Sequence, residues 1–242
     1  MRPARVLAVT VITRILSPFV PSRKMLPFMW WLHRIEGLCE PELLYLNRFS
    51  GSMGIAIDIG SNWGSYTYPL SKRFQRVYAF EINDQTTDLL EKYKGENIKL
   101  VHCGLSSTAG KAMFHVPVMH GRALTGWGSL YRDNLPEAEK FLEKEVQVAP
   151  LDDFGITGIG FMKIDVEGHE VEVLKGAAAT IKQSRPVILI EVKYVNSEMV
   201  DSWFLDLNYR RCSLDDVIGV PGQVGNHIYV PNERLVQLGI NG

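Results

Sequence analysis

Short apolar runs alternate with amphipathic stretches along most of the chain from Ser52 onward. Each apolar run is only a few residues long and is bounded by glycine, polar or charged residues, which is typical of strands buried on both faces of a sheet. The runs that predict strands are "GIAIDIG" (54–60), "RVYAFE" (76–81), "IKLVHCG" (98–104), "KAMFHV" (111–116), "VQVAPLDDF" (146–154), "GFMKIDVE" (160–167), "PVILIEV" (186–192), "YRRCS" (209–213) and "NHIYVP" (226–231).

The amphipathic stretches between these runs predict helices. In "EVEVLKGAAATIKQ" (170–183), apolar residues recur at spacings of 3, 4 and 3 and so share one helical face: Val171, Leu174, Ala178 and Ile181. "DQTTDLLEKYK" (84–94) is predicted to be a helix with Asp84 as its cap. Helices are also predicted over "SYTYPLSKRF" (65–74), which Pro69 would kink or shorten, over "LPEAEKFLEKE" (135–145), and around Glu198–Leu205.

Apolar strands that alternate with helices imply a mostly parallel sheet covered by helices on both faces. The predicted fold class is therefore α/β and doubly wound. The length of 242 residues suggests one domain, and neither an internal repeat nor a low-complexity linker divides it. We predict one domain over residues 51–242, preceded by a helical extension over residues 1–50.

Composition and charge narrow the class of protein. Hydrophobic residues make up 46% and charged residues 22% of the chain, as in ordinary globular proteins. The formal net charge of −1 gives no global reason to expect nucleic acid as a partner. The three cysteines form no CxxC pair, so neither a disulfide framework nor a thiolate zinc site is indicated. A reducing compartment, and hence the cytoplasm, is favoured.

The N-terminal 35 residues contain six Lys or Arg and no acidic residue. The apolar run Val6–Ile12 is broken by Arg14 and lacks a small-residue cleavage site, so it is a poor signal peptide and too short to span a bilayer. Two interpretations remain open. The segment is a helical extension packed on the domain, or its basic, aromatic part "KMLPFMWWLHR" rests on an anionic membrane surface, at the inner face of the membrane.

The first predicted strand ends in "DIGSNWGSY", a glycine-containing turn. Its spacing is G-x-x-x-G, which differs from the G-x-G-x-x-G of dinucleotide-binding folds. Asp58, just before the first glycine, would repel a pyrophosphate but suits a ligand with a cationic end, and S-adenosylmethionine has one. Glu81 ends the second strand, the position from which a carboxylate accepts hydrogen bonds from both ribose hydroxyls. The pair predicts an S-adenosylmethionine site.

Several motifs, in this order, resemble those of the FkbM-type S-adenosylmethionine-dependent methyltransferases: "AIDIGSNWGSYT", "VYAFEINDQT", "LVHCGLSS", "GWGSL", "PLDDF" and "MKIDVEGHEVEVLKGA" followed by "RPVILIEV". The resemblance runs from about Gly54 to Pro231 and leaves the first 50 residues outside. It implies a Rossmann-like methyltransferase domain with a seven-stranded sheet whose last strand is antiparallel. It also implies methylation of a hydroxyl oxygen, typically on a sugar or a natural-product alcohol.

Carried onto this chain, the resemblance assigns the cofactor-binding residues. The methionine part would be held by Asp58, Gly60, Ser61, Asn62 and Gly64, and the ribose by Glu81. The adenine would lie by Gly104, Leu105 and Ser106, with Ile82 and Asn83 packing on the same ring. Trp63 either covers the cofactor or points into the core.

Acidic residues and a histidine cluster where the strand "FMKID" ends. Asp165 would bind the cofactor ammonium, ligate a metal or act as the base, and Glu191 ends the neighbouring strand. Together these two carboxylates are candidate ligands for Mg²⁺. Glu167 and His169 lie in the following turn; His169 would take a proton at neutral pH, or is simply a solvated residue at a helix start. Glu170 and Glu172 are predicted to be solvated.

The segment "VPVMHGRALTGWGSL" is predicted to shape the acceptor pocket, with Trp127 and Ser129 as substrate contacts and with His115 and His120 nearby. His102 is predicted to lie in the core. The leading hypothesis is an O-methyltransferase acting on a hydroxyl of a sugar, glycan or small natural product, with Asp165, Glu167, His169 and Glu191 as the reactive residues. The alternatives are N-methylation, methylation of a macromolecule, or a non-catalytic module docked to a membrane or partner by its basic N-terminus. The oligomeric state is open.

Overall fold

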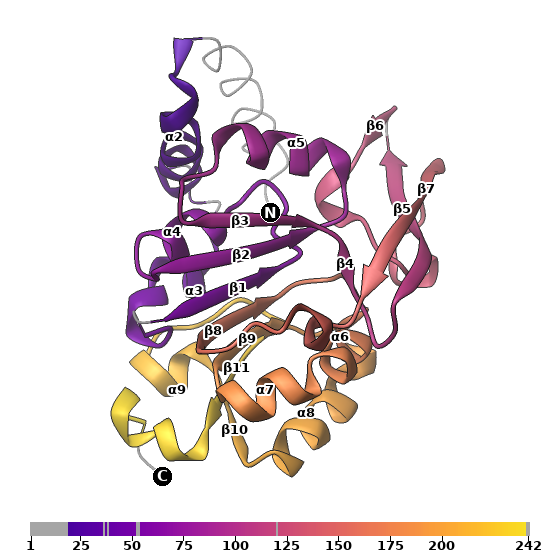
Figure 1. Ribbon diagram of the computed structural model, residues 1–242. Coiled ribbons are helices and arrows are strands. Elements are labelled where there is room, and N and C mark those ends of the chain that lie inside the picture. Colours follow the sequence, from indigo (N-terminus) through magenta and orange to yellow (C-terminus); the bar gives the residue numbers. More distant parts are fainter. Residues whose placement is uncertain (1–18, 36, 38, 52–53, 120, 241–242) are drawn as a thin grey trace.

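The computed structural model describes residues 19–35, 37, 39–51, 54–119 and 121–240 (Figure 1). Its centre is a seven-stranded sheet in the order β3-β2-β1-β8-β9-β11-β10. The strands are β1 (Ile55–Ile59), β2 (Arg76–Glu81), β3 (Ile98–His102), β8 (Ile159–Ile164), β9 (Val187–Glu191), β10 (Tyr209–Cys212) and β11 (Asn226–Pro231). β11 runs antiparallel to both of its neighbours, whereas the other pairings are parallel. The predicted doubly wound sheet with an antiparallel last strand is confirmed.

Helices cover both faces of this sheet (Figure 1). One face carries α2 (Ser22–Ile35), α3 (Pro41–Leu44), α4 (Thr67–Ser71), α5 (Asp84–Tyr93) and α9 (Leu214–Ile218). The other face carries α6 (Glu170–Gly176), α7 (Ala178–Ser184) and α8 (Ser197–Asp206). The 3₁₀ turns are η2 (Leu46–Arg48), η3 (Thr125–Trp127), η4 (Arg132–Asn134), η5 (Leu151–Phe154), η6 (Tyr194–Asn196), η7 (Asn232–Arg234) and η8 (Val236–Leu238).

The central strands divide their side chains between two hydrophobic cores. In β8, Phe161 packs in the core on the α2 side and Met162 in the core on the α6 side. In β9, Leu189 and Ile190 divide in the same way, and all four of these residues are fully buried. Successive side chains of a strand point to opposite faces, so a strand with helices on both faces must be apolar throughout. This is why the sequence shows continuous apolar runs here.

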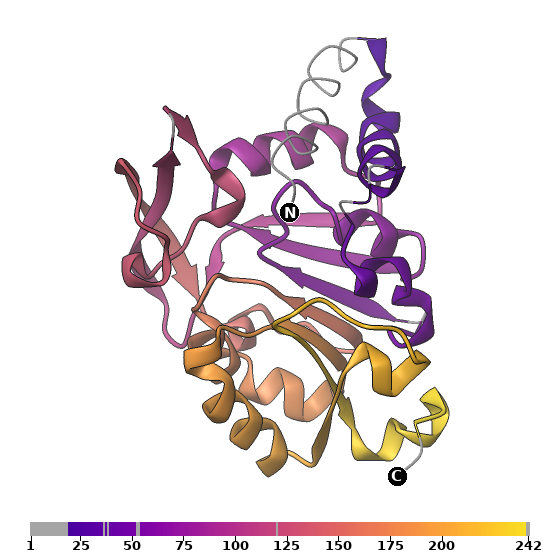
Figure 2. The same cartoon turned by 180° about the vertical axis from the view of Figure 1, so that it is seen from behind.

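A second sheet stands beyond the carboxyl ends of β1, β2 and β3, as the two opposite views show (Figures 1 and 2). Its order is β4-β7-β5-β6. The strands are β4 (Gly104–Leu105), β5 (Gly110–Met119), β6 (Arg122–Ala123) and β7 (Lys140–Ala149). β5 and β7 pair antiparallel from Gly110↔Val148 to Val118↔Lys140.

The helix predicted over residues 135–145 is wrong, because residues 140–149 form β7. The charged residues of this segment are exposed on β7, whereas Val146 and Val148 of the same strand are buried. Cross-strand pairing with β5, including an ion pair of 2.6 Å between Lys111 Nζ and Glu145 Oε1, replaces the helical contacts that the sequence alone suggested. Tertiary pairing overrides local propensity in such exposed strands.

Three smaller predictions also differ from the structure. The helix over residues 170–183 is interrupted at Ala177 and forms α6 and α7. Asn83 rather than Asp84 caps α5, since its Oδ1 accepts a hydrogen bond of 3.1 Å from the backbone N–H of Gln85. His102 ends β3 with its side chain half exposed and within 3.1 Å of Asp84, so it is not a core residue.

The described part of the N-terminal extension is helical and packs on the domain. Met25, Leu26 and Met29 of α2 are buried in the same core as the sheet. Trp63 stacks on His33 of α2 with ring centroids 4.4 Å apart, so it points toward this helix.

The run Val6–Ile12 lies outside the described residues. Within the part of the chain that the structure describes, no helix has the length and apolarity needed to cross a membrane. The domain boundary at residue 50 remains a prediction.

Candidate active site

Two glycines shape the loop after β1. Gly60 has φ +76°, and a Cβ there would lie 1.8 Å from the backbone oxygen of Asp165 at the end of β8. Gly64 has φ +96°, and its Cβ would lie 2.9 Å from Leu90 Cδ1. Only glycine tolerates such backbone angles together with such close approach. The loop is therefore held against the end of β8, where the acidic cluster of the sequence begins.

Asp58 is buried beneath this loop. Its side chain is 2% exposed, and Thr67 Oγ1 donates a hydrogen bond of 2.5 Å to its Oδ2. Burial raises the pKa of Asp58 to about 7, and the nearby Asp165 and Glu81 act in the same direction. The hydroxyl of Ser61, also buried, has no hydrogen-bond partner among the described residues. A ligand that brings an ammonium and a carboxylate would satisfy both groups, so they fit the methionine end of S-adenosylmethionine.

Glu81 connects the glycine loop to the end of β2. Its carboxylate accepts hydrogen bonds from the backbone N–H groups of Asn62 (2.7 Å), Ile82 (2.8 Å) and Asn83 (2.8 Å). Burial raises the pKa of Glu81, and these hydrogen bonds offset part of that rise. A carboxylate has about four acceptor positions, so at least one remains for a ribose hydroxyl. The predicted cofactor residues of β1 and β2 are thus brought together.

The loop predicted to lie by the adenine is adjacent. A Cβ on Gly104 would lie 2.9 Å from Ile82 Cγ2, so these two predicted cofactor residues are in contact. Leu105 is buried, and the backbone N–H of Ser106 donates to Ala149 of β7. The cofactor-binding roles of these residues remain predictions.

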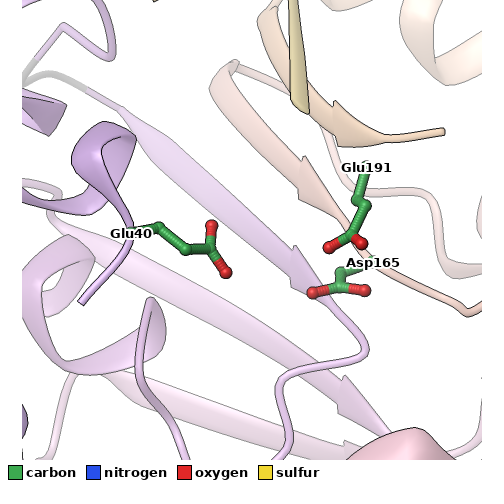
Figure 3. Close-up of side chains that lie close together, drawn as sticks. All are labelled: Glu40, Asp165 and Glu191. Carbon is green, nitrogen blue, oxygen red and sulfur yellow. The ribbon is translucent and has the colours of Figure 1, made fainter. Parts of the chain in front are cut away.

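Three carboxylates converge at the ends of β8 and β9, from Glu40, Asp165 and Glu191 (Figure 3). One oxygen from each carboxylate lies within 4.8 Å of one oxygen from each of the other two. Glu40 belongs to the N-terminal extension, and sequence reasoning missed it because no motif marks it. It is held by hydrogen bonds from Tyr66 OH (2.7 Å) and Asn226 Nδ2 (2.9 Å). The acidic group therefore draws on the extension, the central sheet and, through Asn226, the last strand.

Lys163 lies beside this group and was also missed. Its side chain is 1% exposed, with Nζ 3.7 Å from Asp165 Oδ2 and 5.2 Å from the centre of the Tyr66 ring. Burial lowers the pKa of Lys163, but Asp165, together with the other acidic residues nearby, raises it more, so the net pKa is raised and the ammonium stays charged. Mg²⁺ fits this donor set poorly, because a second cation would be repelled by the ammonium and three carboxylates are an incomplete shell.

Glu191 has a strongly raised pKa. Burial, together with the charge of Asp165, raises the pKa of Glu191 to about 7. A carboxyl with such a pKa is divided between its acidic and basic forms at neutral pH. Such perturbed groups are concentrated at functional sites.

The turn after β8 has an unusual backbone. Glu167 has φ +50° and Gly168 has φ +100°, and Lys193 Nζ lies 2.5 Å from Glu167 Oε2. The prediction of a solvated Glu170 is wrong, because its side chain is 1% exposed. Its carboxylate accepts hydrogen bonds of 2.7 Å from the Gly168 N–H and from the side-chain amide of Asn196, which fix the turn. Glu172, by contrast, is partly exposed and pairs with Lys175 at 2.6 Å, as expected.

His169 is enclosed rather than solvated. Its side chain is 7% exposed, and Nε2 lies 3.0 Å from Ser106 Oγ in the predicted adenine loop. Nδ1 has no hydrogen-bond partner among the described residues, and the Tyr131 ring lies 4.9 Å away between centroids. Burial lowers the pKa of His169, so the ring is neutral at pH 7. Its proton-accepting role stays a prediction.

The segment predicted to shape the acceptor pocket lies over the glycine loop. A Cβ on Gly126 would be 3.0 Å from Asn62 Nδ2, and the neighbouring Trp127 is 48% exposed. Ser129 is buried, and its hydroxyl donates to the Glu167 backbone oxygen at 2.8 Å and accepts from the Tyr131 N–H at 3.0 Å. His115 contacts Glu143 at 3.2 Å, and His120 lies outside the described residues. The substrate contacts of Trp127 and Ser129 stay predictions.

Comparison with known proteins assigns the family. The model of the "Methyltransferase FkbM domain" matches residues 58–211. The chain belongs to the FkbM methyltransferase family. This FkbM chain is 30% identical over 142 residues to the hexuronic acid methyltransferase AglP of Haloferax volcanii, an alignment that covers 56% of this chain and 54% of AglP. It therefore spans about half the length of that relative.

The fold of this FkbM chain is also found in a solved structure. The FkbM methyltransferase from Methylobacillus flagellatus KT superposes with a TM-score of 0.50 at 15% identity, over 93% of this chain and 58% of that one. The family resemblance and the fold predicted from the sequence are confirmed. Glu40 lies outside the matched residues 58–211, so its presence near Asp165 is a feature that the family match alone would not reveal.

Proposed function

We propose that this FkbM chain is an S-adenosylmethionine-dependent methyltransferase that methylates a hydroxyl oxygen of a sugar, a glycan or a small natural product. One observation carries the proposal: acidic side chains from four neighbouring strands, β1, β2, β8 and β9, gather beside a glycine loop at one edge of the sheet. Ligands of open α/β sheets bind at the carboxyl ends of the strands. A sugar is the favoured acceptor because AglP is named a hexuronic acid methyltransferase.

The residues of the glycine loop fit the cofactor. When bound, S-adenosylmethionine supplies a methyl group on a positively charged sulfur. Asp58 and Ser61 offer a buried carboxylate and an unpartnered hydroxyl to its methionine part, and Glu81 offers a carboxylate oxygen to its ribose. The positive end of the ligand favours the ionised form of Asp58 and so offsets the unfavourable burial of that charge.

The acceptor side consists of the residues that the sequence predicted as reactive, together with Glu40. Asp165, Glu191 and Glu40 present carboxylate oxygens that accept hydrogen bonds from sugar hydroxyls. We assign proton removal to Glu191, because a base works best when its pKa lies near the working pH. His169 is bonded to Ser106 instead, and we assign it to positioning the turn that carries Glu167. The positioning of an acceptor oxygen can itself supply several kcal/mol of the rate enhancement.

The free cysteines fit a reducing compartment, and we place the protein in the cytoplasm. Nucleic acid is a poor alternative acceptor, because the candidate site is acidic and would repel phosphates.

Calorimetry with S-adenosylmethionine tests the cofactor assignment. Glu81→Gln keeps the shape of the side chain but removes a charge, and should weaken binding by about tenfold or more. Glu91→Gln, at an exposed position of α5, is the matched control and should bind normally. Equal affinity of both variants would refute the assignment.

Transfer of labelled methyl groups tests the acceptor. The wild type is incubated with neutral hexoses, hexuronic acids, amines and RNA, each with and without a chelator. Methylation of a sugar that persists with chelator and yields an alkali-stable methyl ether supports the proposal. Methylation of an amine or RNA alone, or cofactor binding with no transfer to any acceptor, contradicts it. Loss of sugar methylation on chelation would show that a metal takes part.

A further inference from the structure

The rotation of α2 about its own axis is fixed by the side that it buries. Met25, Leu26, Met29 and Leu32 are each no more than 6% exposed, and the first three belong to the central core. Leu26 Cδ2 also lies near Gly64 of the predicted cofactor loop. A helix held by so many buried residues must present its remaining sides in a defined direction.

A neighbouring side of α2 carries a stripe that we define as Lys24, Phe28, Trp31 and Ile35, of which Phe28 is partly buried and packs against the core. The spacing of 4, 3 and 4 places these residues in one row along the helix. Trp31 is 52% and Ile35 is 56% exposed, and the Phe28 and Trp31 rings stack with centroids 6.2 Å apart. Phe19, just before the helix, is 81% exposed. Large apolar residues gathered in this way mark an interaction surface.

The charge of the N-terminal segment favours one class of partner. Residues 1–35 contain six basic and no acidic residues, whereas the other 207 residues contain 20 basic and 27 acidic ones. Lys24 and Arg34 of α2 are both exposed. A second copy of this chain would bring the same positive segment against itself, so self-association through the stripe is disfavoured. An anionic surface is complementary in charge, and a bilayer also accepts exposed aromatic rings at its headgroup level.

We propose that the stripe on α2 docks this protein on the surface of an anionic membrane. α2 has 14 residues, fewer than the roughly 20 that cross a bilayer, and buries one side against the protein, so it would contact the headgroups and not span the bilayer. Trp31 and Ile35 enter the interface between headgroups and acyl chains, and Lys24 and Arg34 contact lipid phosphates. The inference does not depend on methyl transfer, since it uses none of the proposed site residues.

Vesicle sedimentation of the full chain tests the proposal. We expect binding to vesicles of phosphatidylcholine mixed with phosphatidylglycerol, little binding to phosphatidylcholine alone, and partial release by salt. Trp31→Ala/Ile35→Ser should lower the partition coefficient by about tenfold or more, because the bilayer contact loses its main apolar groups. Met113→Ala/Leu142→Ser is the matched control, since both residues are 45% exposed on the second sheet, and it should bind as the wild type does.

Quenching by lipids brominated along the acyl chain locates the contact. We expect fluorescence quenching in the wild type that is reduced in Trp31→Phe, although the other tryptophans remain. Unchanged thermal melting shows that the variants are folded, as expected for side chains that are half exposed. No binding of the wild type to anionic vesicles, equal binding of both double variants, or a dimer in light scattering that only Trp31→Ala/Ile35→Ser abolishes would each overturn the proposal.

Discussion

Replacement of Lys163 by Met should destabilise the protein in a pH-dependent way. The side chain is fully buried, its Nζ lies 3.7 Å from Asp165 Oδ2, and the carboxylates of Asp58 and Glu191 also act on its pKa. Methionine keeps much of the volume and removes only the charge. At an effective dielectric constant of about 20, one ion pair at this separation contributes about 4 kcal/mol. Removal of one member of a buried ion pair typically lowers the free energy of unfolding by about 3–5 kcal/mol, which agrees with this Coulomb energy.

The pH dependence follows from the two raised carboxyl pKa values. Asp58 and Glu191 each have a pKa of about 7 in the folded protein, above the ordinary values of acidic side chains. Their contribution to stability is therefore present at low pH and is lost as the pH rises through about 7. Lys163 limits that loss, because it offsets their negative charge. The variant should lose about 3–5 kcal/mol at pH 8 and a smaller amount at pH 5.5, where Asp58 and Glu191 are protonated and only the contact of Lys163 with Asp165 is lost.

Urea unfolding of wild type and variant at pH 8 and pH 5.5 measures this difference. Lys182→Met, at an exposed position of α7, is the control and should change stability by no more than about 0.5 kcal/mol at either pH. An equal loss for Lys163→Met at both pH values would refute the electrostatic reasoning. A loss of less than about 1 kcal/mol of unfolding free energy at pH 8 would show that the Lys163 ammonium does not stabilise the nearby carboxylates.

Three further predictions concern the site and its loop. Glu191→Gln should lower kcat by about 10²–10⁴-fold with unchanged cofactor affinity. The rise of kcat with pH up to about 7, expected for the wild type, should disappear in the variant. A normal kcat of the variant would exclude Glu191 as the base. S-adenosylmethionine affinity, measured by calorimetry, should rise between pH 6 and pH 8 with proton release, because Asp58 with a pKa of about 7 must ionise to bind a cation; pH-independent affinity would contradict this. Gly60→Ala should lower stability by more than about 2 kcal/mol in thermal melts, because its Cβ would lie 1.8 Å from the Asp165 backbone oxygen. Gly110→Ala, with open space around it, should melt as the wild type does. Similar melting curves of the two variants would contradict the steric argument.

The central sheet was predictable because strands that are buried on both faces have continuous apolar runs in the sequence. β8 and β9 must be apolar at nearly every position, so their continuous runs are visible in the sequence. β7 lacked such a signal, since only alternate residues near its end are buried and its glutamates and lysines are good helix formers. Its pairing with β5 decides its conformation, and a local pattern does not contain that information.

The candidate site was predictable where residues follow strand ends. Asp58, Glu81, Asp165 and Glu191 come together because parallel strands end at one edge. Glu170 was misplaced because an acid in a first helical turn is usually solvated, and its burial depends on Asn196 from a distant loop. Lys163 was read as part of an apolar strand, and Glu40 follows no motif, so neither was assigned to the site.

The placement of β11 has a consequence for how the protein is made. β11 is the last strand of the described residues in sequence order, yet it lies inside the sheet between β9 and β10. When β10 has just been synthesised, β11 does not yet exist. β10 then lacks its pairing partner, and one edge of β9 is unpaired as well. Unpaired edges of this kind promote aggregation of nascent chains. Productive folding of this half of the sheet must therefore wait until β11 has been synthesised, and chains that terminate before Asn226 should depend on chaperones or be degraded.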